Sequence, residues 1–242
     1  MKRINWAAFA LCAFLLALPA LAEQNVTKTS FYYVAESRTF YSFIPAIDAP
    51  LPVVVLLHGS GRNGEIMADL WKDIAARQQF IVAAPDADDS AAWDIKMDPP
   101  SFLHAVVDQV ASIHPIDRNR IYLFGHSAGA EYALLPAILD SHYFAAIALH
   151  AGALQPGYSK LFAYAGRRMP IAIWVGDHDP LFPLDSVTAT KKEFEANGFP
   201  IKLSVIPNHD HNYYAISKDI NADAWDFLKE AQLRAPDIAS PQ

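Results

Sequence analysis

The sequence predicts an α/β fold with a mostly parallel sheet of about eight strands and helices on both of its faces. Apolar segments of strand length alternate along the chain with segments of helical spacing, which is the order that βαβ units produce. Residues 52–57 are apolar without a break, as expected of a strand that is buried on both faces. No internal repeat or long linker divides the chain, so we expect a single domain over residues 23–242.

The elements follow from the same patterns, taken in order. Aromatic and β-branched residues on either side of a short break predict an edge hairpin at 30–36 and 38–44. The strand at 52–57 then ends in a glycine-containing turn at 58–64. Further strands are predicted at 80–84, 120–124, 144–149, 170–175 and 201–206, and helices at 65–77, 100–113, 128–139, 186–197 and 217–233. Residues 152–168 are the only insertion that could form a cap, so we expect little or no lid.

The first 22 residues have a different character. Two basic residues precede an apolar run at 6–18, and small residues follow it up to Ala22. This pattern predicts a signal peptide over 1–22 that is cleaved after Ala22, giving a secreted or periplasmic protein without a membrane anchor. The apolar run is shorter than the roughly 20 residues of a membrane-spanning helix, which disfavours an anchor. Cys12 is the only cysteine, so the mature chain is expected to contain no disulfide.

The charge balance argues against a nucleic-acid partner. Without Lys2 and Arg3, 17 basic residues face 26 acidic ones, which gives the mature chain a net charge of −9. Such a surface repels polyanions, and no cluster of Lys and Arg offsets it locally.

The clearest chemical motif is the run Gly125-His126-Ser127-Ala128-Gly129. It follows the apolar strand at 121–124 and opens a predicted helix, which is the context that a nucleophile elbow requires. The tight turn leaves no room for side chains at Gly125 and Gly129, and it presents the Ser127 hydroxyl above the sheet near the positive end of a helix. We therefore expect Ser127 to be a nucleophile.

A serine nucleophile needs a base and an acid, in the chain order serine, acid, histidine. Two aspartates, Asp177 and Asp179, lie in the turn after the strand at 171–175, although Asp is also common in ordinary turns. Two histidines, His209 and His211, follow the last predicted strand. The residue pattern alone leaves both choices open.

The oxyanion of an acyl-transfer reaction needs fixed N–H donors. One is expected to be the backbone N–H of Ala128. The other is expected from the turn after residues 52–57, with Ser60 as first choice and Gly61 as second. His58 in the same turn is interpreted as a structural hydrogen-bonding residue.

Trp93 and Tyr158 follow strands and could line a substrate pocket, and packing is the alternative for each. His209 could also line the pocket if His211 is the base. One cluster has the ligand types that zinc prefers: His178, Asp179, His209 and His211. A catalytic triad explains its placement better, and neither a metal nor a cofactor is predicted.

Three segments resemble a known family: Arg38-Thr39-Phe40-Tyr41-Ser42-Phe43-Ile44-Pro45, Leu56-Leu57-His58-Gly59 and Ile116-Asp117-Arg118-Asn119-Arg120-Ile121-Tyr122. With the elbow, they make the mature chain resemble the α/β-hydrolase superfamily, and within it the secreted polyhydroxybutyrate depolymerase and feruloyl esterase-like enzymes. The resemblance implies the α/β-hydrolase fold and one catalytic domain.

The same resemblance favours one acid and one base. A Gly-x-x-Asp-x-x-x-Pro turn after this strand is where such enzymes carry the acid, and it matches Asp179. The run Asp210-His211-Asn212-Tyr213-Tyr214 resembles the Asp-His-Ser-Tyr run around the catalytic histidine of esterase D-like enzymes, which favours His211. His209 resembles the Gly-His turn of other hydrolases, with Asn208 in place of the glycine.

The chain is thus expected to be an exported serine esterase that forms an acyl-enzyme on Ser127, with a small or polymeric ester as its substrate. A peptidase of the prolyl-oligopeptidase type and a catalytically silent binding protein on the same fold are the alternatives. Neither the ester nor the oligomeric state follows from the sequence.

Overall fold

The computed structural model describes residues 25–234, so the expected signal peptide at 1–22 and Cys12 lie outside the described residues. The described residues build one eight-stranded sheet in the order β1-β2-β4-β3-β5-β6-β7-β8. β1 and β2 run antiparallel to their neighbours and the other strands are parallel. The strands are β1 (Thr27–Tyr33), β2 (Glu36–Phe43), β3 (Leu51–Leu57), β4 (Ile81–Pro85), β5 (Ile116–His126), β6 (Ala146–His150), β7 (Ile171–Gly176) and β8 (Ile201–Ile206). The predicted fold class is confirmed.

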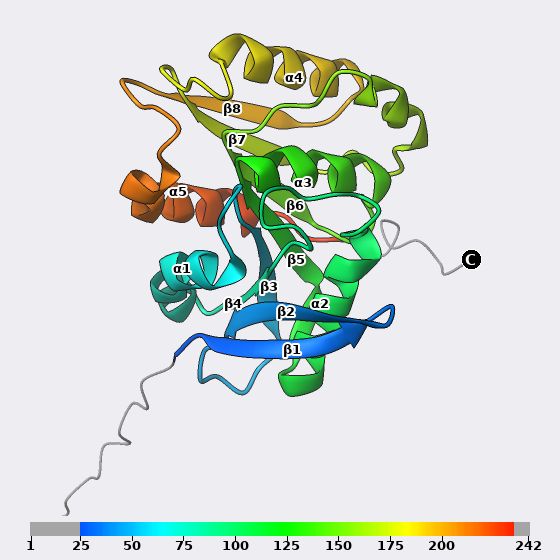
Figure 1. Ribbon diagram of the computed structural model, residues 1–242, viewed down its shortest axis with the longest axis vertical. Helices are drawn as coiled ribbons and strands as arrows, with labels where there is room; N and C mark the ends of the chain where they lie inside the picture. The colour runs from blue at the N-terminus through cyan, green and yellow to red at the C-terminus, as the bar shows by residue number, and fades with distance from the viewer. Residues whose placement is uncertain (1–24, 235–242) are drawn as a thin grey trace, which may run out of the picture.

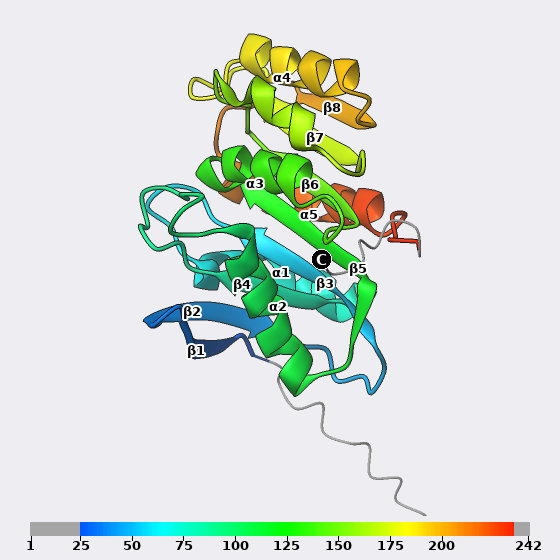
Figure 2. The ribbon, with the colours of Figure 1, turned by 90° about the vertical axis from the view of Figure 1, so that its right-hand side faces the viewer.

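Helices cover both faces of this sheet (Figures 1 and 2). α1 (Gly64–Gln78) and α5 (Tyr213–Leu228) pack on one face, and α2 (Pro100–Ile113), α3 (Ala128–Leu139) and α4 (Leu184–Ala196) pack on the other. Every residue of β3, β4, β6 and β7 is buried, which explains why these strands have no polar alternation in the sequence. Side chains alternate between two apolar clusters, one on each face.

Some boundaries differ from those expected. The break in the hairpin lies at Val34 and Ala35, both with positive φ, and not around residue 37. A β-branched residue is rare in that conformation, so turn chemistry gave no signal there. β5 begins at Ile116, earlier than expected. Its first half is partly exposed and polar, so it lacks the apolar run that predicted the second half. Residues 158–164, within the expected insertion, form a 3₁₀ helix, η1 (Tyr158–Tyr164).

α5 begins at Tyr213 and ends at Leu228, four residues earlier at its start than expected and five earlier at its end. Its first residue is fully buried: the Tyr213 hydroxyl donates to Asn221 Oδ1 and accepts from Trp71 Nε1, 2.9 Å away. This tertiary packing starts the helix in a pair of tyrosines whose intrinsic preference is for strands.

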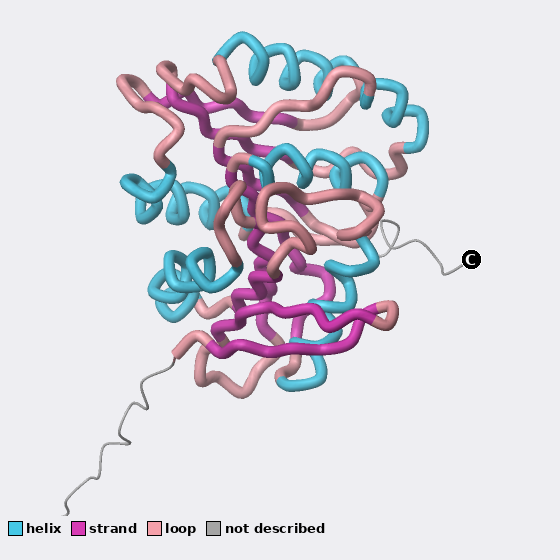
Figure 3. Tube along the Cα trace, in the orientation of Figure 1, coloured by secondary structure: helices cyan, strands magenta, loops and turns pink. Residues whose placement is uncertain are grey.

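The loops that matter for chemistry lie at one edge of the sheet. Parallel strands bring their carboxyl ends to the same side, so the segments after β3, β4, β5, β6, β7 and β8 meet there, drawn as loops in Figure 3. Within residues 25–234, the helices are all too short or too polar to cross a lipid bilayer.

Candidate active site

Ser127 occupies the sharp turn between β5 and α3. Its φ of 55° and ψ of −120° lie outside the regions that residues other than glycine usually adopt. A Cβ added to Gly125 would lie 2.4 Å from the Gly129 carbonyl oxygen, and one added to Gly129 would lie 2.5 Å from the Leu57 carbonyl oxygen. Both glycines are therefore required by close backbone approach, and the turn has the geometry of a nucleophile elbow.

The structure brings His211 and Asp179 together with Ser127. His211 Nε2 lies 2.9 Å from Ser127 Oγ, and His211 Nδ1 lies 2.8 Å from Asp179 Oδ2. The Asp179 side chain is fully buried, whereas that of His211 is 20% exposed. Asp179 Oδ1 accepts the backbone N–H groups of Leu181 and Phe182, each at 2.9 Å, so the carboxylate can present only Oδ2 to the imidazole.

The alternative acid and base lie elsewhere. Asp177 has a side chain that is 33% exposed, and its Oδ1 accepts the His209 backbone N–H at 3.3 Å. The His209 ring faces His150, with the ring centroids 5.9 Å apart, and its Nε2 is buried without a hydrogen-bond partner among the described residues. Neither residue is hydrogen-bonded to Ser127.

The loop after β3 passes very close to the serine. A Cβ added to Gly59 would lie 3.2 Å from the Ser127 Cβ, a tight contact, so glycine favours this close approach of the backbone to Ser127. The Gly61 N–H, the second choice for an oxyanion donor, already donates to the Ser90 carbonyl at 2.7 Å and is therefore not free for that role. Among the described residues no acceptor takes the Ser60 N–H, and Ala128 is the first residue of α3, where backbone N–H groups lack intrahelical partners.

A long loop at residues 86–99, between β4 and α2, holds the loop after β3 in place. The Ser60 hydroxyl donates to the Ala91 carbonyl, and Trp93 Nε1 donates to the His58 carbonyl at 2.9 Å. His58 is buried and neutral, because its Nε2 accepts the Ala87 N–H at 3.1 Å while burial lowers its pKa. This supports the interpretation of His58 as a structural residue.

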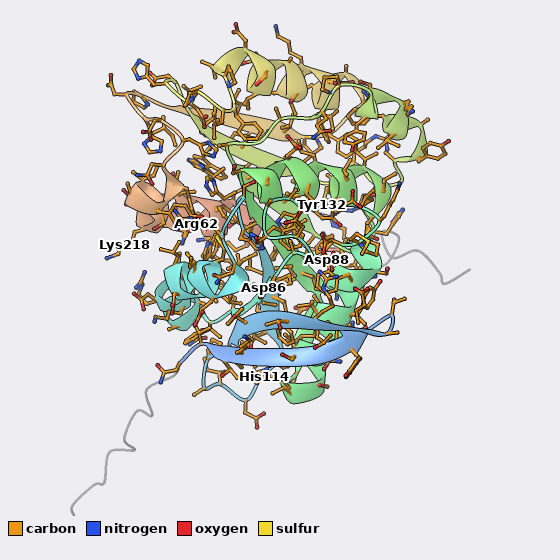
Figure 4. All side chains as sticks on the ribbon, viewed as in Figure 1. Arg62, Asp86, Asp88, His114, Tyr132 and Lys218 are labelled. Atoms are coloured by element: carbon orange, nitrogen blue, oxygen red, sulfur yellow. The ribbon has the colours of Figure 1, made fainter. Side chains whose placement is uncertain are left out.

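The 86–99 loop is itself fixed by a buried ion pair between Arg38 on β2 and Asp98. The Asp98 carboxylate also accepts the N–H groups of Asp88, at 3.0 Å, and Asp94, at 3.1 Å. Tyr132 on α3 donates to the Asp98 carbonyl, and Figure 4 labels Tyr132 and Asp88 where the loop passes α3. Sequence reasoning missed this pair, since no local pattern links residues that are 60 positions apart.

A pocket of about 90 Å³ adjoins the elbow. Both expected pocket residues, Trp93 and Tyr158, lie in its wall, whereas His209 is not part of the lining. The remaining wall is formed by apolar and polar residues together: Ala92, Asp94, Ile95, Ala128, Glu131, Tyr132, Leu135 and Gln155.

Two buried histidines lie behind His211. His126 Nδ1 is 3.1 Å from His150 Nδ1, so one ring donates and the other accepts. Burial is the main cause that lowers the pKa of His126 to about 3 and that of His150 to about 2. The His126 ring also packs against His211, with the centroids 5.0 Å apart. The sequence analysis assigned no role to His126, although its place within the elbow was a signal.

A metal-binding interpretation of the histidines has little geometric support. In the part of the chain from residue 25 to residue 234, the His, Cys, Asp and Glu side chains do not form a group of three or more that could hold an ion. The His178 side chain is 68% exposed and lies against Asp177 instead of joining His211.

Comparisons with known proteins identify the family of the chain. A family model described as the dienelactone hydrolase family matches residues 87–233. A bifunctional acetylxylan esterase/xylanase of Neocallimastix patriciarum is 26% identical over 162 residues, which is 65% of this chain. The match spans only 24% of that longer protein.

Solved structures share the fold. A ferulic acid esterase of Anaeromyces mucronatus superposes with a TM-score of 0.70 at 16% identity, covering 88% of this chain and 93% of that one. A fluorophosphonate-binding serine hydrolase of Staphylococcus aureus gives a TM-score of 0.74 at 14% identity, covering 85% and 98%.

Proposed function

The chain belongs to the dienelactone hydrolase family, with the α/β-hydrolase fold, and we propose that it cleaves carboxylic esters through an acyl-enzyme on Ser127. One observation carries the proposal above all others. The imidazole of His211 is hydrogen-bonded on one side to Ser127 Oγ, at 2.9 Å, and on the other to Asp179 Oδ2, at 2.8 Å. This is the arrangement in which a histidine can take the proton of a serine hydroxyl.

In the first half of the reaction, Ser127 Oγ attacks the ester carbonyl carbon while its proton moves to His211 Nε2. The buried Asp179 carboxylate stabilises the imidazolium and fixes the tautomer that leaves Nε2 free to accept. The tetrahedral intermediate then collapses, the carbon–oxygen bond to the alcohol breaks, and His211 returns the proton to the departing alkoxide.

In the second half, water attacks the acyl carbon while His211 takes one of its protons. The bond between this carbon and Ser127 Oγ then breaks, the carboxylic acid leaves, and His211 returns the proton to Oγ. In both halves, negative charge develops on the carbonyl oxygen. We assign the stabilisation of this charge to the backbone N–H groups of Ala128 and Ser60. The Ala128 N–H lies at the positive end of α3, and the Ser60 N–H lies on the loop that Gly59 brings against Ser127.

The names of two similar proteins suggest substrates to test. One is called an acetylxylan esterase/xylanase and the other, a structural neighbour, a ferulic acid esterase, so we include sugar-linked esters among the first substrates. Export of the protein, with cleavage after Ala22, remains part of the proposal on the strength of the sequence pattern alone.

Replacing the serine tests the proposal directly. Ser127→Ala should lower kcat for p-nitrophenyl acetate by at least about 10³-fold, because it removes the only group that can form the acyl-enzyme. Labelling by a fluorophosphonate probe should disappear in the same variant. Ser112→Ala, on the exposed side of α2, is the matched control and should keep wild-type turnover and labelling. Undiminished ester turnover in folded Ser127→Ala would refute the proposal, as would turnover of peptide anilides with no turnover of esters.

A further inference from the structure

The pocket beside the elbow begins at Ala128 and follows one face of α3. Ala128, Tyr132 and Leu135 are spaced at i, i+4 and i+7, so their side chains share that face. Trp93 of the 86–99 loop and Tyr158 also line the pocket. The pocket therefore lies along α3 beside Ala128, a proposed oxyanion donor, and two of its lining residues, Tyr132 and Leu135, are buried.

The position of this pocket relative to His211 decides which half of an ester it can hold. His211 Nε2 must reach the oxygen of the departing alcohol, so the alcohol lies on the His211 side of the carbonyl carbon. Neither the turn after β7 nor the turn after β8, which carry Asp179 and His211, contributes a residue to the pocket lining. The lining comes instead from the 86–99 loop, α3 and the segment that contains η1, so we assign this pocket to the acyl group.

The volume limits that acyl group. The pocket has a volume of about 90 Å³. An engineered apolar cavity that holds one benzene ring has about 150 Å³. A chain of up to three carbons beyond the carbonyl fits, whereas an aromatic acid or a long fatty acyl chain does not.

The walls are not free to move aside. The Tyr132 hydroxyl donates to the Asp98 carbonyl, and Trp93 Nε1 donates to the His58 carbonyl at 2.9 Å. The two aromatic rings also pack on each other, with the centroids 5.6 Å apart. Rotating either ring to widen the pocket would break a hydrogen bond of a partly or fully buried group.

The charges of the lining exclude a second class of substrate. Glu131 and Asp94 are its ionisable acids, and neither Lys nor Arg lines the pocket. Glu131 accepts a hydrogen bond from Gln155, which does not neutralise its charge. A carboxylate on the acyl group would face like charge without a cation to pair with.

From these observations we propose that the acyl specificity of the enzyme is for short, uncharged groups, from acetyl to butyryl, and that Trp93, Tyr132, Leu135 and Tyr158 set the limit. This inference rests on the proposed esterase function and names the substrate class of the same site.

Measuring kcat/KM on p-nitrophenyl acetate, butyrate, octanoate and ferulate tests the size limit. We expect octanoate and ferulate to be at least about tenfold poorer than acetate or butyrate. The hemisuccinate, which has the length of butyrate plus one charge, should also be at least about tenfold poorer than butyrate once its uncatalysed rate is subtracted.

Two tyrosines on the same 3₁₀ helix provide a matched pair of variants. Tyr158→Ala removes a wall of the pocket, so the octanoate-to-acetate ratio of kcat/KM should rise about tenfold. Tyr164→Ala, at the other end of η1, removes a side chain that is 74% exposed and outside the lining, and should leave the ratio as in the wild type.

The outcomes separate this inference from the function on which it depends. Wild-type enzyme that cleaves ferulate or octanoate as well as acetate would refute the short-acyl limit while leaving the esterase intact. An equal change of the ratio in Tyr158→Ala and Tyr164→Ala would refute the role of Tyr158. Absence of turnover on all five esters, with Ser127 unlabelled by the fluorophosphonate, would refute the esterase function itself and the inference with it.

Discussion

Neighbouring groups orient the Asp179 carboxylate and the His211 ring. Two backbone N–H groups hold one oxygen of Asp179, which leaves the other for the imidazole. The His211 ring packs against Phe182, with the centroids 5.7 Å apart, and against His126, with the centroids 5.0 Å apart. An imidazole that is hydrogen-bonded at both nitrogens and packed against two rings does not have to be reoriented before the proposed proton transfer.

The two histidines of the last turn should behave very differently when replaced. His211→Gln should lower kcat for p-nitrophenyl acetate by about 10³-fold or more, because glutamine cannot take the Ser127 proton. His209→Gln should retain kcat within about threefold, since His209 is not hydrogen-bonded to Ser127 and is not part of the pocket. Steady-state kinetics on both variants provide the check. A large loss in His209→Gln with retained activity in His211→Gln would reverse the assignment.

How far the site could be predicted differs among these residues. Ser127 was readable because a strand, a five-residue turn and a helix must coincide in the sequence. The choice of Asp179 over Asp177 depended on a resemblance, because the burial of Asp179 and its two backbone donors are tertiary facts. For Gly61, the sequence could not exclude a role as an oxyanion donor. Its N–H donates to the carbonyl of Ser90, on a loop about 30 residues away, and no local pattern indicates that bond.

At the level of elements, the 86–99 loop connects the pocket beside the elbow with the loop after β3, which carries Ser60. It supplies Trp93 to the pocket and, through Ser90 and Ala91, accepts the hydrogen bonds that hold the loop after β3. The buried pair of Arg38 and Asp98 anchors it to β2, and the Arg38 guanidinium carbon stacks 3.8 Å from the centroid of the Phe102 ring. The positions of Trp93 and of the loop after β3 therefore both depend on the ion pair between Arg38 and Asp98.

Weakening this ion pair should affect stability and activity together. Asp98→Asn leaves the Arg38 guanidinium buried without its counter-charge, so the free energy of unfolding should fall by about 3–5 kcal/mol. Because the loop also loses an anchor, kcat/KM for p-nitrophenyl acetate should fall about tenfold at temperatures where the variant is folded. Urea unfolding and steady-state kinetics measure the two effects.

An exposed ion pair on α2 and β5 provides the control. Asp108→Asn removes the carboxylate that lies 2.8 Å from the Arg118 guanidinium, where both side chains are more than half exposed. Its unfolding free energy should change by no more than about 1 kcal/mol. Equal effects of Asp98→Asn and Asp108→Asn would show that the buried pair does not anchor the loop.

Element boundaries were predictable where burial is uniform and not where it changes along the element. The strands β3 and β4 are buried throughout, and their apolar runs marked them to within one residue. β5 begins in partly exposed, polar residues and only its second half is apolar, so only that half was recognised. The turn after the edge strand β1 can hold Val34 at a positive φ because the Val34 side chain is 81% exposed.

On the scale of the whole molecule, stability should depend on pH through two histidines in the interior. His126 and His150 lie at the carboxyl ends of neighbouring central strands, paired at Cα level across the sheet, and both are nearly or fully buried. Burial lowers the pKa of the first to about 3 and of the second to about 2, so both are neutral in the folded state above about pH 4. In the unfolded chain the same rings have a pKa of about 6.5.

Below pH 6.5 the unfolded state therefore binds protons that the folded state does not, and the free energy of unfolding must fall as the pH falls. The stabilisation is complete above pH 6.5 and is lost progressively below it, with about 2 kcal/mol lost per histidine between pH 7 and pH 5. Urea unfolding at pH 7, 6 and 5 measures this slope. His150→Gln should have a smaller slope than the wild type because one titrating ring is gone while the buried His126 and His58 remain. His178→Gln should keep the wild-type slope, since that side chain is 68% exposed in the fold. A wild-type stability that stays constant or rises from pH 7 to pH 5 would show that water or a rearrangement lets these rings ionise inside the folded protein.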